Sequence, residues 1–321
     1  MTFNRIIVLV ATLIGCSSAF AEIKKMTKSG GLTIFKGDFR YRHEDIDDAS
    51  KDVRRSRQRM RLRIGLEKKV SRDFNVIVRV ASGDQRSNST NQSLDGGFSS
   101  KGAWLDLAYF KMQPMVLKEI TLQAGKMKNP FFCPGDSSLI WDSDVNPEGL
   151  SLGYERNFSN FFVESVGSYY WVNELSSSDK DVVLQSGQLS IGLENDRLKV
   201  RFGASIYSYL NIQSSENIVG SDNFSGNTGR LAEDGENQLY ANDYRLQNYF
   251  AEVAFKDLPV IFFYDTVVNH RVKEQNSGYL LGFSVASTKS SFPIKFKYSY
   301  REVEKESIFG LFADSDFIGG A

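Results

Sequence analysis

Cysteine, proline and long apolar runs are scarce in this 321-residue chain, and each scarcity argues against a particular kind of structure. Two cysteines cannot build the disulfide framework of a small secreted domain. After the N-terminus, no apolar run approaches the roughly 20 residues that a membrane-spanning helix needs. Proline occurs 6 times, which favours strands over irregular structure.

An excess of one charge is also missing, because 39 basic residues balance 39 acidic ones. This balance does not indicate a protein that binds nucleic acid. The mean hydropathy of −0.31 excludes a helical membrane protein, but not a barrel whose polar lumen offsets its lipid face. His43 and His270 are the only histidines, and no nucleophile, phosphate-binding or zinc motif accompanies them. We therefore expect no enzyme activity, no cofactor and no metal.

The N-terminus has the pattern of a secretory leader. Arg5 precedes an apolar run from Ile6 to Ile14, and Ala19-Phe20-Ala21 is a small-residue cleavage site. We expect a signal peptide over residues 1–21 and one barrel domain over residues 22–321. Cleavage would leave Cys133 as the only cysteine. The alternative is a lipoprotein-type signal that lipidates Cys16.

In the middle of the segment from Arg54 to Val70, polar and apolar residues alternate strictly. Its arginines at positions 57, 59, 61 and 63 share one parity, and Met60, Leu62, Ile64 and Leu66 share the other. A strand sends successive side chains to opposite faces, so one face is cationic and the other apolar. A transmembrane barrel wall needs both faces, with lipid outside and a water-filled lumen inside.

Similar alternation recurs along the chain and predicts about thirteen strands. In one of them, Leu105 and Leu107 form the apolar face opposite Asp106. The connections alternate long and short, as in outer-membrane barrels. The predicted strands are about 32–42, 57–67, 74–80, 103–112, 120–128, 150–155, 161–173, 188–194, 198–207, 244–255, 260–268, 279–285 and 294–301.

An odd strand number does not fit a single-chain bacterial barrel, which has an even one. We therefore expect the sequence to lack a C-terminal part, with sixteen or more strands in the complete protein. A miscounted strand is the rival explanation. The predicted fold class is all-β, a transmembrane antiparallel β-barrel.

Two groups of residues are candidates for the pore. On the basic side, seven arginines of the first strands share the polar face, and such a wall attracts anions. The alternative is a solvated, salt-bridged wall without solute preference. On the acidic side, the irregular stretch from Asn129 to Glu148 would fold into the lumen and set Asp142 and Asp144 opposite the arginines, or else remain an external loop. The pore-lining basic candidates are Arg40, Arg42, Arg57, Arg59, Arg61, Arg63 and Arg79.

Asp142, Asp144 and Asn146 also match the start of a calcium-binding loop. The match then fails, because Pro147 stands where such a loop needs glycine and Gly153 where it needs glutamate. We expect no calcium there.

Several segments resemble the putative porins of proteobacteria, distant relatives of the phosphate- and pyrophosphate-selective porins. They are GDFRYRHE from Gly37, RQRMRLRIGLEKKVSRDFNVIVRVASGD from Arg57, KGAWLDLAYFKM from Lys101, LQAGKMKNPF from Leu122 and LIWDSDVNPEGLSLGYE from Leu139. FADSDF, from Phe312, is similar to an internal segment of that family. The resemblance implies an outer-membrane diffusion channel for small hydrophilic solutes, surrounded by lipid in a Gram-negative bacterium, and weakly a homotrimer.

Two other classes stay open at this point. A non-conducting barrel could act as an adhesin or surface receptor, with the long acidic loop from Gln213 to Asp243 as its binding element. A soluble secreted β-sandwich could also show alternating strands, although it would have no reason to segregate long and short connections.

Overall fold

The computed structural model describes residues 19–26, 32–46, 53–176, 180–218, 224–233, 235, 237–287 and 294–314. Strands dominate these residues, and the helical elements among them are three short 3-10 turns (η1–η3). None of the helices in this part of the chain is long and apolar enough to cross a membrane. The elements are β1 (Ala19–Met26), β2 (Leu32–Ile46), β3 (Arg55–Lys69), β4 (Phe74–Ser82), β5 (Gln92–Ser93), β6 (Ala103–Met112), β7 (Ile120–Lys126), η1 (Pro134–Asp136), β8 (Glu148–Phe158), β9 (Phe161–Asn173), β10 (Val182–Glu194), β11 (Leu198–Leu210), η2 (Phe224–Gly226), β12 (Gly229–Leu231), β13 (Gln238–Tyr240), β14 (Arg245–Phe255), β15 (Val260–Asn269), β16 (Ser277–Ser287), β17 (Ile294–Val303) and η3 (Gly310–Phe312).

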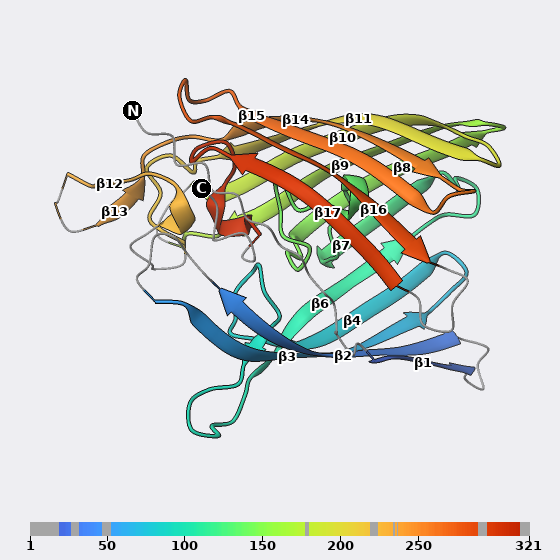
Figure 1. Ribbon diagram of the computed structural model, residues 1–321, viewed down its shortest axis with the longest axis horizontal. Helices are drawn as coiled ribbons and strands as arrows, with labels where there is room; N and C mark the ends of the chain where they lie inside the picture. Colours follow the sequence, from blue (N-terminus) through green and yellow to red (C-terminus); the bar gives the residue numbers. More distant parts are fainter. Residues whose placement is uncertain are drawn as a thin grey trace.

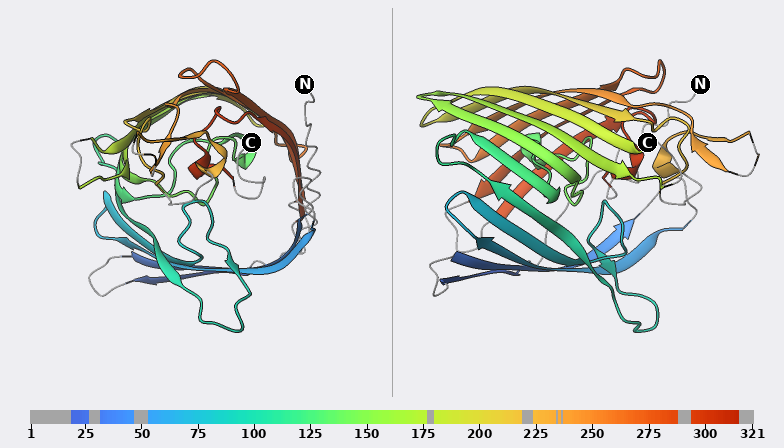
Figure 2. Two further views of the ribbon diagram at one scale, coloured as in Figure 1. Left: turned by 90° about the vertical axis from the view of Figure 1, so that its left-hand side faces the viewer. Right: turned by 180° about the vertical axis from the view of Figure 1, so that it is seen from behind.

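Fourteen strands follow one another in a single antiparallel sheet, from β1 to β17 in chain order (Figure 1). The short β5 pairs with β3 beside this path, and β12 and β13 form a separate hairpin. Seen along its axis, the sheet curves round a central space that inserted segments partly fill (Figure 2). The molecule is an antiparallel β-barrel, although β1 and β17 do not pair with each other in the described residues.

All thirteen predicted strands are present, so the all-β barrel prediction is confirmed, and the described sheet contains one further strand in its path, β1. β1 pairs with β2 from Ala19 opposite Phe39 to Met26 opposite Leu32. The segment was missed because it is short and overlaps the end of the predicted leader. That leader stays a prediction, since residues 1–18, with Cys16, lie outside the described part.

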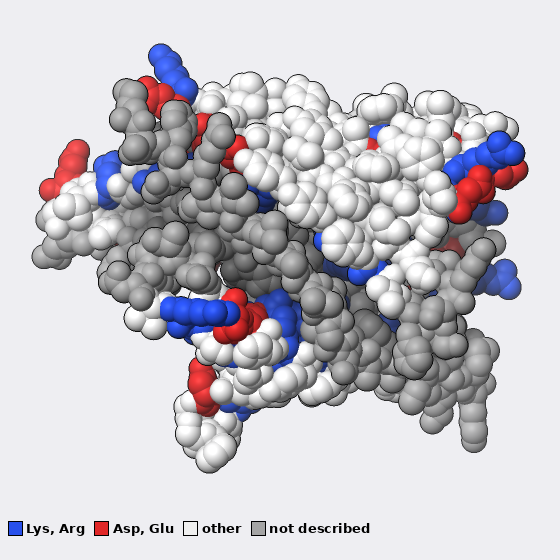
Figure 3. Space-filling view, viewed as in Figure 1, with Lys and Arg blue, Asp and Glu red and all other residues white. Residues whose placement is uncertain are grey.

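The two faces of the wall differ as the alternation predicts. On β3, Ile64 is 58% exposed, whereas Arg59 is only 7% exposed. Large apolar side chains are exposed on nearly every strand, and Figure 3 shows an uncharged surface over β15–β17 with charges gathered near the strand ends. A soluble monomer rarely exposes so large an apolar surface, which suits contact with lipid.

A β-bulge in β6 places Leu107 on the opposite face from the one predicted. The register between β4 and β6 shifts so that Val80 pairs with Leu105 and Arg79 with Leu107, which leaves Asp106 as the extra residue. Leu105 is 56% exposed, but Leu107 is 4% exposed and lies on the inner face with Arg79. Strict alternation was wrong beyond Asp106 because a bulge changes the parity.

The connections also follow the predicted asymmetry. Among the connections that the structure describes throughout, residues 83–102, 127–147 and 270–276 lie at the same end of the barrel. Residues 127–147, here called the inserted loop, and residues 304–314, here called the inner tail, enter the space inside the barrel. Both pack into a buried aromatic cluster on the inner faces of β9–β11 and β14–β16.

Candidate functional site

The seven arginines predicted to line the pore, here called the arginine wall, share the inner face of β2–β4. The β2–β3 register sets Arg40 directly opposite Arg61 and Arg42 opposite Arg59. Like charges opposite each other destabilise a sheet unless other groups compensate them. Four guanidinium groups thus form the centre of the wall.

Two carboxylates bracket this centre along the same strands. Asp38 stands opposite Arg63 and accepts hydrogen bonds from Arg61 (Nε, 3.1 Å) and Arg63 (Nε, 3.1 Å). Glu44 stands opposite Arg57 at the other end and forms ion pairs with Arg42, Arg57 and Arg59. The alternation within β2 therefore supplies both the charges and part of their compensation.

The connection between β4 and β6 adds neutral partners that sequence reasoning missed. β5 pairs with β3 and brings Ser89 and Asn91 to the wall. Nη2 of Arg59 donates to the hydroxyl of Ser89 and the carbonyl of Asn91, both at 3.1 Å, and Arg40 donates to the amide oxygen of Asn91. A serine- and asparagine-rich stretch gives no periodic signal, so nothing in its pattern predicts this return to β3.

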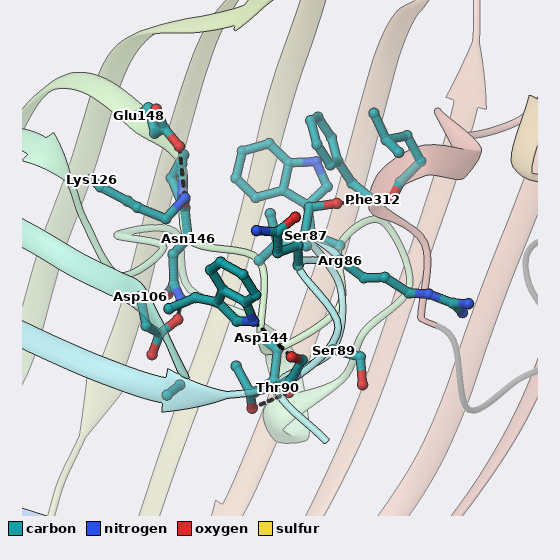
Figure 4. Close-up of a pocket in the computed structure, with 18 of the residues that line it drawn as sticks. Arg86, Ser87, Ser89, Thr90, Asp106, Lys126, Asp144, Asn146, Glu148 and Phe312 are labelled. Carbon is teal, nitrogen blue, oxygen red and sulfur yellow. Dashed lines mark hydrogen bonds and ion pairs between the residues drawn. The ribbon is translucent and has the colours of Figure 1, made fainter. Parts of the chain in front are cut away.

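Arg79 extends the wall to the next strand. It pairs with Asp106 at the bulge, and the other oxygen of Asp106 accepts from Nδ2 of Asn146 at 2.6 Å. Asn146 belongs to the inserted loop, so this contact ties the loop to the wall (Figure 4). The bulge has a clear effect: it sets Asp106 between an arginine and the loop.

Aromatic packing holds the inserted loop inside the barrel. Trp141 is buried and contacts the rings of Phe131, Tyr170 and Tyr207 at centroid distances of 5.6–6.1 Å. Its Nε1 donates to the hydroxyl of Tyr209 at 3.3 Å. The loop is therefore anchored on the β9–β11 side, and its other side faces the arginines.

The two predicted acids of the loop lie differently. Asp144 reaches the wall, with Oδ1 at 3.6 Å from Nη1 of Arg63, and accepts from Thr90 (N at 3.0 Å, Oγ1 at 2.9 Å; Figure 4). Asp142 accepts from the backbone N–H of Asp144 at 2.7 Å and lies near Asp314. Burial, reinforced by the charge of Asp314, raises the pKa of Asp142 to about 8.

The inner tail makes contacts that were not predicted from the sequence. The carbonyl of Phe312 accepts from the backbone N–H of Asp142 at 2.8 Å, and the carbonyl of Ala313 accepts from Asn88 at 2.9 Å. The buried carboxylate of Glu306 accepts from the hydroxyl of Tyr244 at 2.7 Å. The tail therefore joins the inserted loop and the β4–β6 connection in one luminal assembly.

The inner face of β2–β4 is a charged surface on which carboxylates partly compensate the arginines. Six of the seven arginines form ion pairs with the four carboxylates Asp38, Glu44, Asp106 and Asp144, and Arg40 donates to Asn91, so arginines outnumber the carboxylates that contact the wall. Among the described residues, no group of three or more His, Cys, Asp or Glu side chains is placed to hold a metal ion. His43 lies beside Gln58 on β3, far along the chain from His270.

Comparison with known proteins agrees with this architecture. A family described as "Putative porin" matches residues 16–243. The chain belongs to the putative porin family. No curated protein matches it.

Solved porins share the fold at low sequence identity. An OprB of Pseudomonas putida, solved at high pH, aligns with a TM-score of 0.52 and 11% identity over 90% of this chain and 76% of its own. An OmpF of Salmonella typhi, solved in complex with daunomycin, aligns with a TM-score of 0.50 and 8% identity over 91% of this chain and 96% of its own. The chain is thus an outer-membrane porin in general fold and family, which favours a channel over an enzyme.

Proposed function

We propose that this porin lets small hydrophilic solutes diffuse passively through the outer membrane of a Gram-negative bacterium, with a preference for anions. The observation that carries the preference is the excess of arginine over carboxylate on the inner face of β2–β4. In a water-filled passage with low-dielectric walls, such an excess attracts anions and repels cations.

The narrow part of the route would lie between the arginine wall and the inserted loop. Arg63 and Asp144, 3.6 Å apart, would mark its closest approach. The paired arginines would present a moderate rather than a maximal positive field, because each carboxylate screens its neighbours. Asp142, turned towards the inner tail, would act on the loop's position rather than on the solute. We expect the barrel to assemble as a homotrimer.

Planar-bilayer recording in a salt gradient tests the proposal. The full chain should form open channels whose reversal potential indicates anion preference. Replacing Arg57, Arg59, Arg61 and Arg63 together with glutamine should move that potential towards cation preference. Channels with no such movement would contradict the proposed role of the wall, and a folded barrel without channels would favour the receptor alternative.

A further inference from the structure

A second row of basic residues lies on the inner face of β17. Lys295, Lys297 and Arg301 alternate with outer residues such as Phe296 and Tyr298, which are 54% and 43% exposed. β17 ends the sheet at the side opposite β1, and in the view along the barrel axis it comes round beside β1–β3 (Figure 2). The row and the arginine wall therefore border the lumen from adjoining sides.

The basic row of β17 contacts the inserted loop. Nζ of Lys295 lies 3.2 Å from Oδ2 of Asp136, and Nζ of Lys297 donates to the backbone carbonyl of Asp136 at 3.0 Å. Asp136 belongs to η1, whereas Asp144, further along the loop, lies beside Arg63. The loop thus presents one carboxylate to β17 and another to the arginine wall.

The contact between the loop and β17 is open to solvent although it lies inside the barrel. The side chain of Lys295 is 50% exposed and that of Asp136 is 87% exposed. By contrast, inward side chains of β14 and β15 such as Leu246 and Val267 are fully buried in the aromatic cluster. The exposed contact indicates that open lumen, rather than packed core, borders β17 here.

The positive charge of the two lysines is only partly compensated. Within the described residues, Asp136 is the one carboxylate at ion-pair distance from them, and it faces Lys295. Nζ of Lys297 has neutral partners instead, the Asp136 carbonyl and the ring of Phe263, whose centroid is 5.4 Å away. A carbonyl and an aromatic face stabilise an ammonium group without cancelling its net charge. Lys297 therefore adds positive charge to this side of the lumen.

The lysines lie towards the other end of the barrel from the first arginines of the wall. β3 starts at the end that carries the connection 83–102, so Arg57 to Arg63 lead inward from that end. β17 starts at the opposite end, because β16 begins after the connection 270–276, and Lys295 and Lys297 are its second and fourth residues. A solute that has passed the arginine wall would next meet these lysines.

We propose that Lys297, supported by Lys295, is a second contact for permeating anions and raises the anion preference of the passage. This inference rests on the proposed function, because it assigns a further selectivity-determining residue to the same route. An anion leaving Arg63 would meet a positive charge across the lumen instead of a neutral wall. That charge lowers the electrostatic barrier on the way to the other end of the barrel.

Reversal potentials of single-residue variants test this role. Lys297→Gln removes the charge and keeps a side chain that can donate to the Asp136 carbonyl. In a tenfold gradient of potassium chloride below about 0.1 M, where charges act over about 10 Å, its anion-to-cation permeability ratio should fall about twofold. Lys297→Arg keeps the charge and should keep the wild-type ratio. Lys256→Gln is the matched control and should leave the ratio unchanged, because Lys256 lies in an exposed turn at the same end of the barrel and pairs with Glu194 at 2.9 Å.

The possible outcomes separate this inference from the proposed function. An unchanged ratio in Lys297→Gln, or an equal fall in Lys256→Gln or in Lys297→Arg, would overturn the inference. If Lys297→Gln fails to fold, Lys295→Gln provides the same comparison and should lower the ratio in the same direction. A wild-type channel that prefers cations contradicts the proposed function itself, whereas an anion-preferring wild type with an unchanged Lys297→Gln contradicts only the role of Lys297.

Discussion

The two sides of the lumen differ in the side chains that point inward and in what those side chains contact. On β9–β11 and β14–β16, inward side chains such as Tyr209 and Leu246 are buried with the inserted loop and the inner tail in one aromatic cluster. On β2–β4, the inward side chains are arginines held by scattered carboxylates and amides. One side behaves as a protein core and the other as a polar surface, and the inserted loop is the partition between them.

The comparison teaches why the loop can carry charge into the lumen. Burial of its aromatic residues on one side stabilises the folded state. This stabilisation offsets the conformational entropy that is lost when about twenty residues become ordered. Its polar residues Asp144 and Asn146 then face the arginine wall from a fixed position. Breaking the aromatic side should therefore loosen the passage, whereas changing the charged side should alter its selectivity.

The largest expected effect comes from removing the anchor of the loop. Trp141→Ala should lower the free energy of unfolding by about 3–5 kcal/mol, because a buried indole and its ring contacts are lost. Unfolding by urea in lipid vesicles measures the change, and single-channel recording should show larger, noisier conductance. Trp171→Ala, on the half-exposed outer face, is the matched control and should cost less. Equal losses from both variants would contradict the anchoring role.

A smaller effect is expected from the charged side. Asp38→Asn removes the carboxylate shared by Arg61 and Arg63 and should destabilise the barrel by about 2 kcal/mol, while strengthening anion preference. Asp45→Asn, whose partner Arg54 is also exposed, should change stability by at most about 0.5 kcal/mol. Thermal unfolding and reversal potential together report both effects. A shift towards cations in Asp38→Asn would be incompatible with a positive wall.

The contact between the loop and the inner tail should depend on pH. The pKa of Asp142 is about 8 in the folded chain, against 3.8 for an ordinary aspartate, so the folded state holds a proton that the unfolded state releases. Its stabilisation is fully present below about pH 4 and is lost as pH rises through about 8. The thermal midpoint in detergent should therefore fall by a few degrees between pH 5 and pH 9. Asp142→Asn should flatten this fall, and an unchanged profile would exclude Asp142 as its source.

Much of the barrel could be predicted from local pattern. Alternation over residues such as Arg57–Leu66 predicts which side chains lie on each face of a strand, and thirteen strands were predicted in this way. Leu107 was misplaced because a bulge at Asp106 reverses the parity, and such a bulge depends on the neighbouring strand. β1 was missed because it is short and overlaps the end of the predicted leader.

The lumen was less predictable than the wall. The acids of the inserted loop could be proposed from their sequence, but only the three-dimensional packing separates Asp144, beside Arg63, from Asp142, beside the inner tail. The roles of Asn91, Asn146 and Glu306 follow from segments that return to the lumen without any periodic signal. Side chains in such segments find their partners through tertiary contacts, which sequence spacing does not encode.

One measurement tests most directly that ions follow the arginine wall. Arg61 lies in the wall, whereas Arg201 on β11 is 6% exposed, paired with Glu164 and held 3.9 Å from the ring centroid of Phe132 in the loop. Arg61→Gln and Arg201→Gln each remove one positive charge from the lumen. In a tenfold gradient of potassium chloride, Arg61→Gln should move the reversal potential towards cation preference, and Arg201→Gln should leave it unchanged. Equal shifts, or a shift in Arg201→Gln alone, would contradict the account.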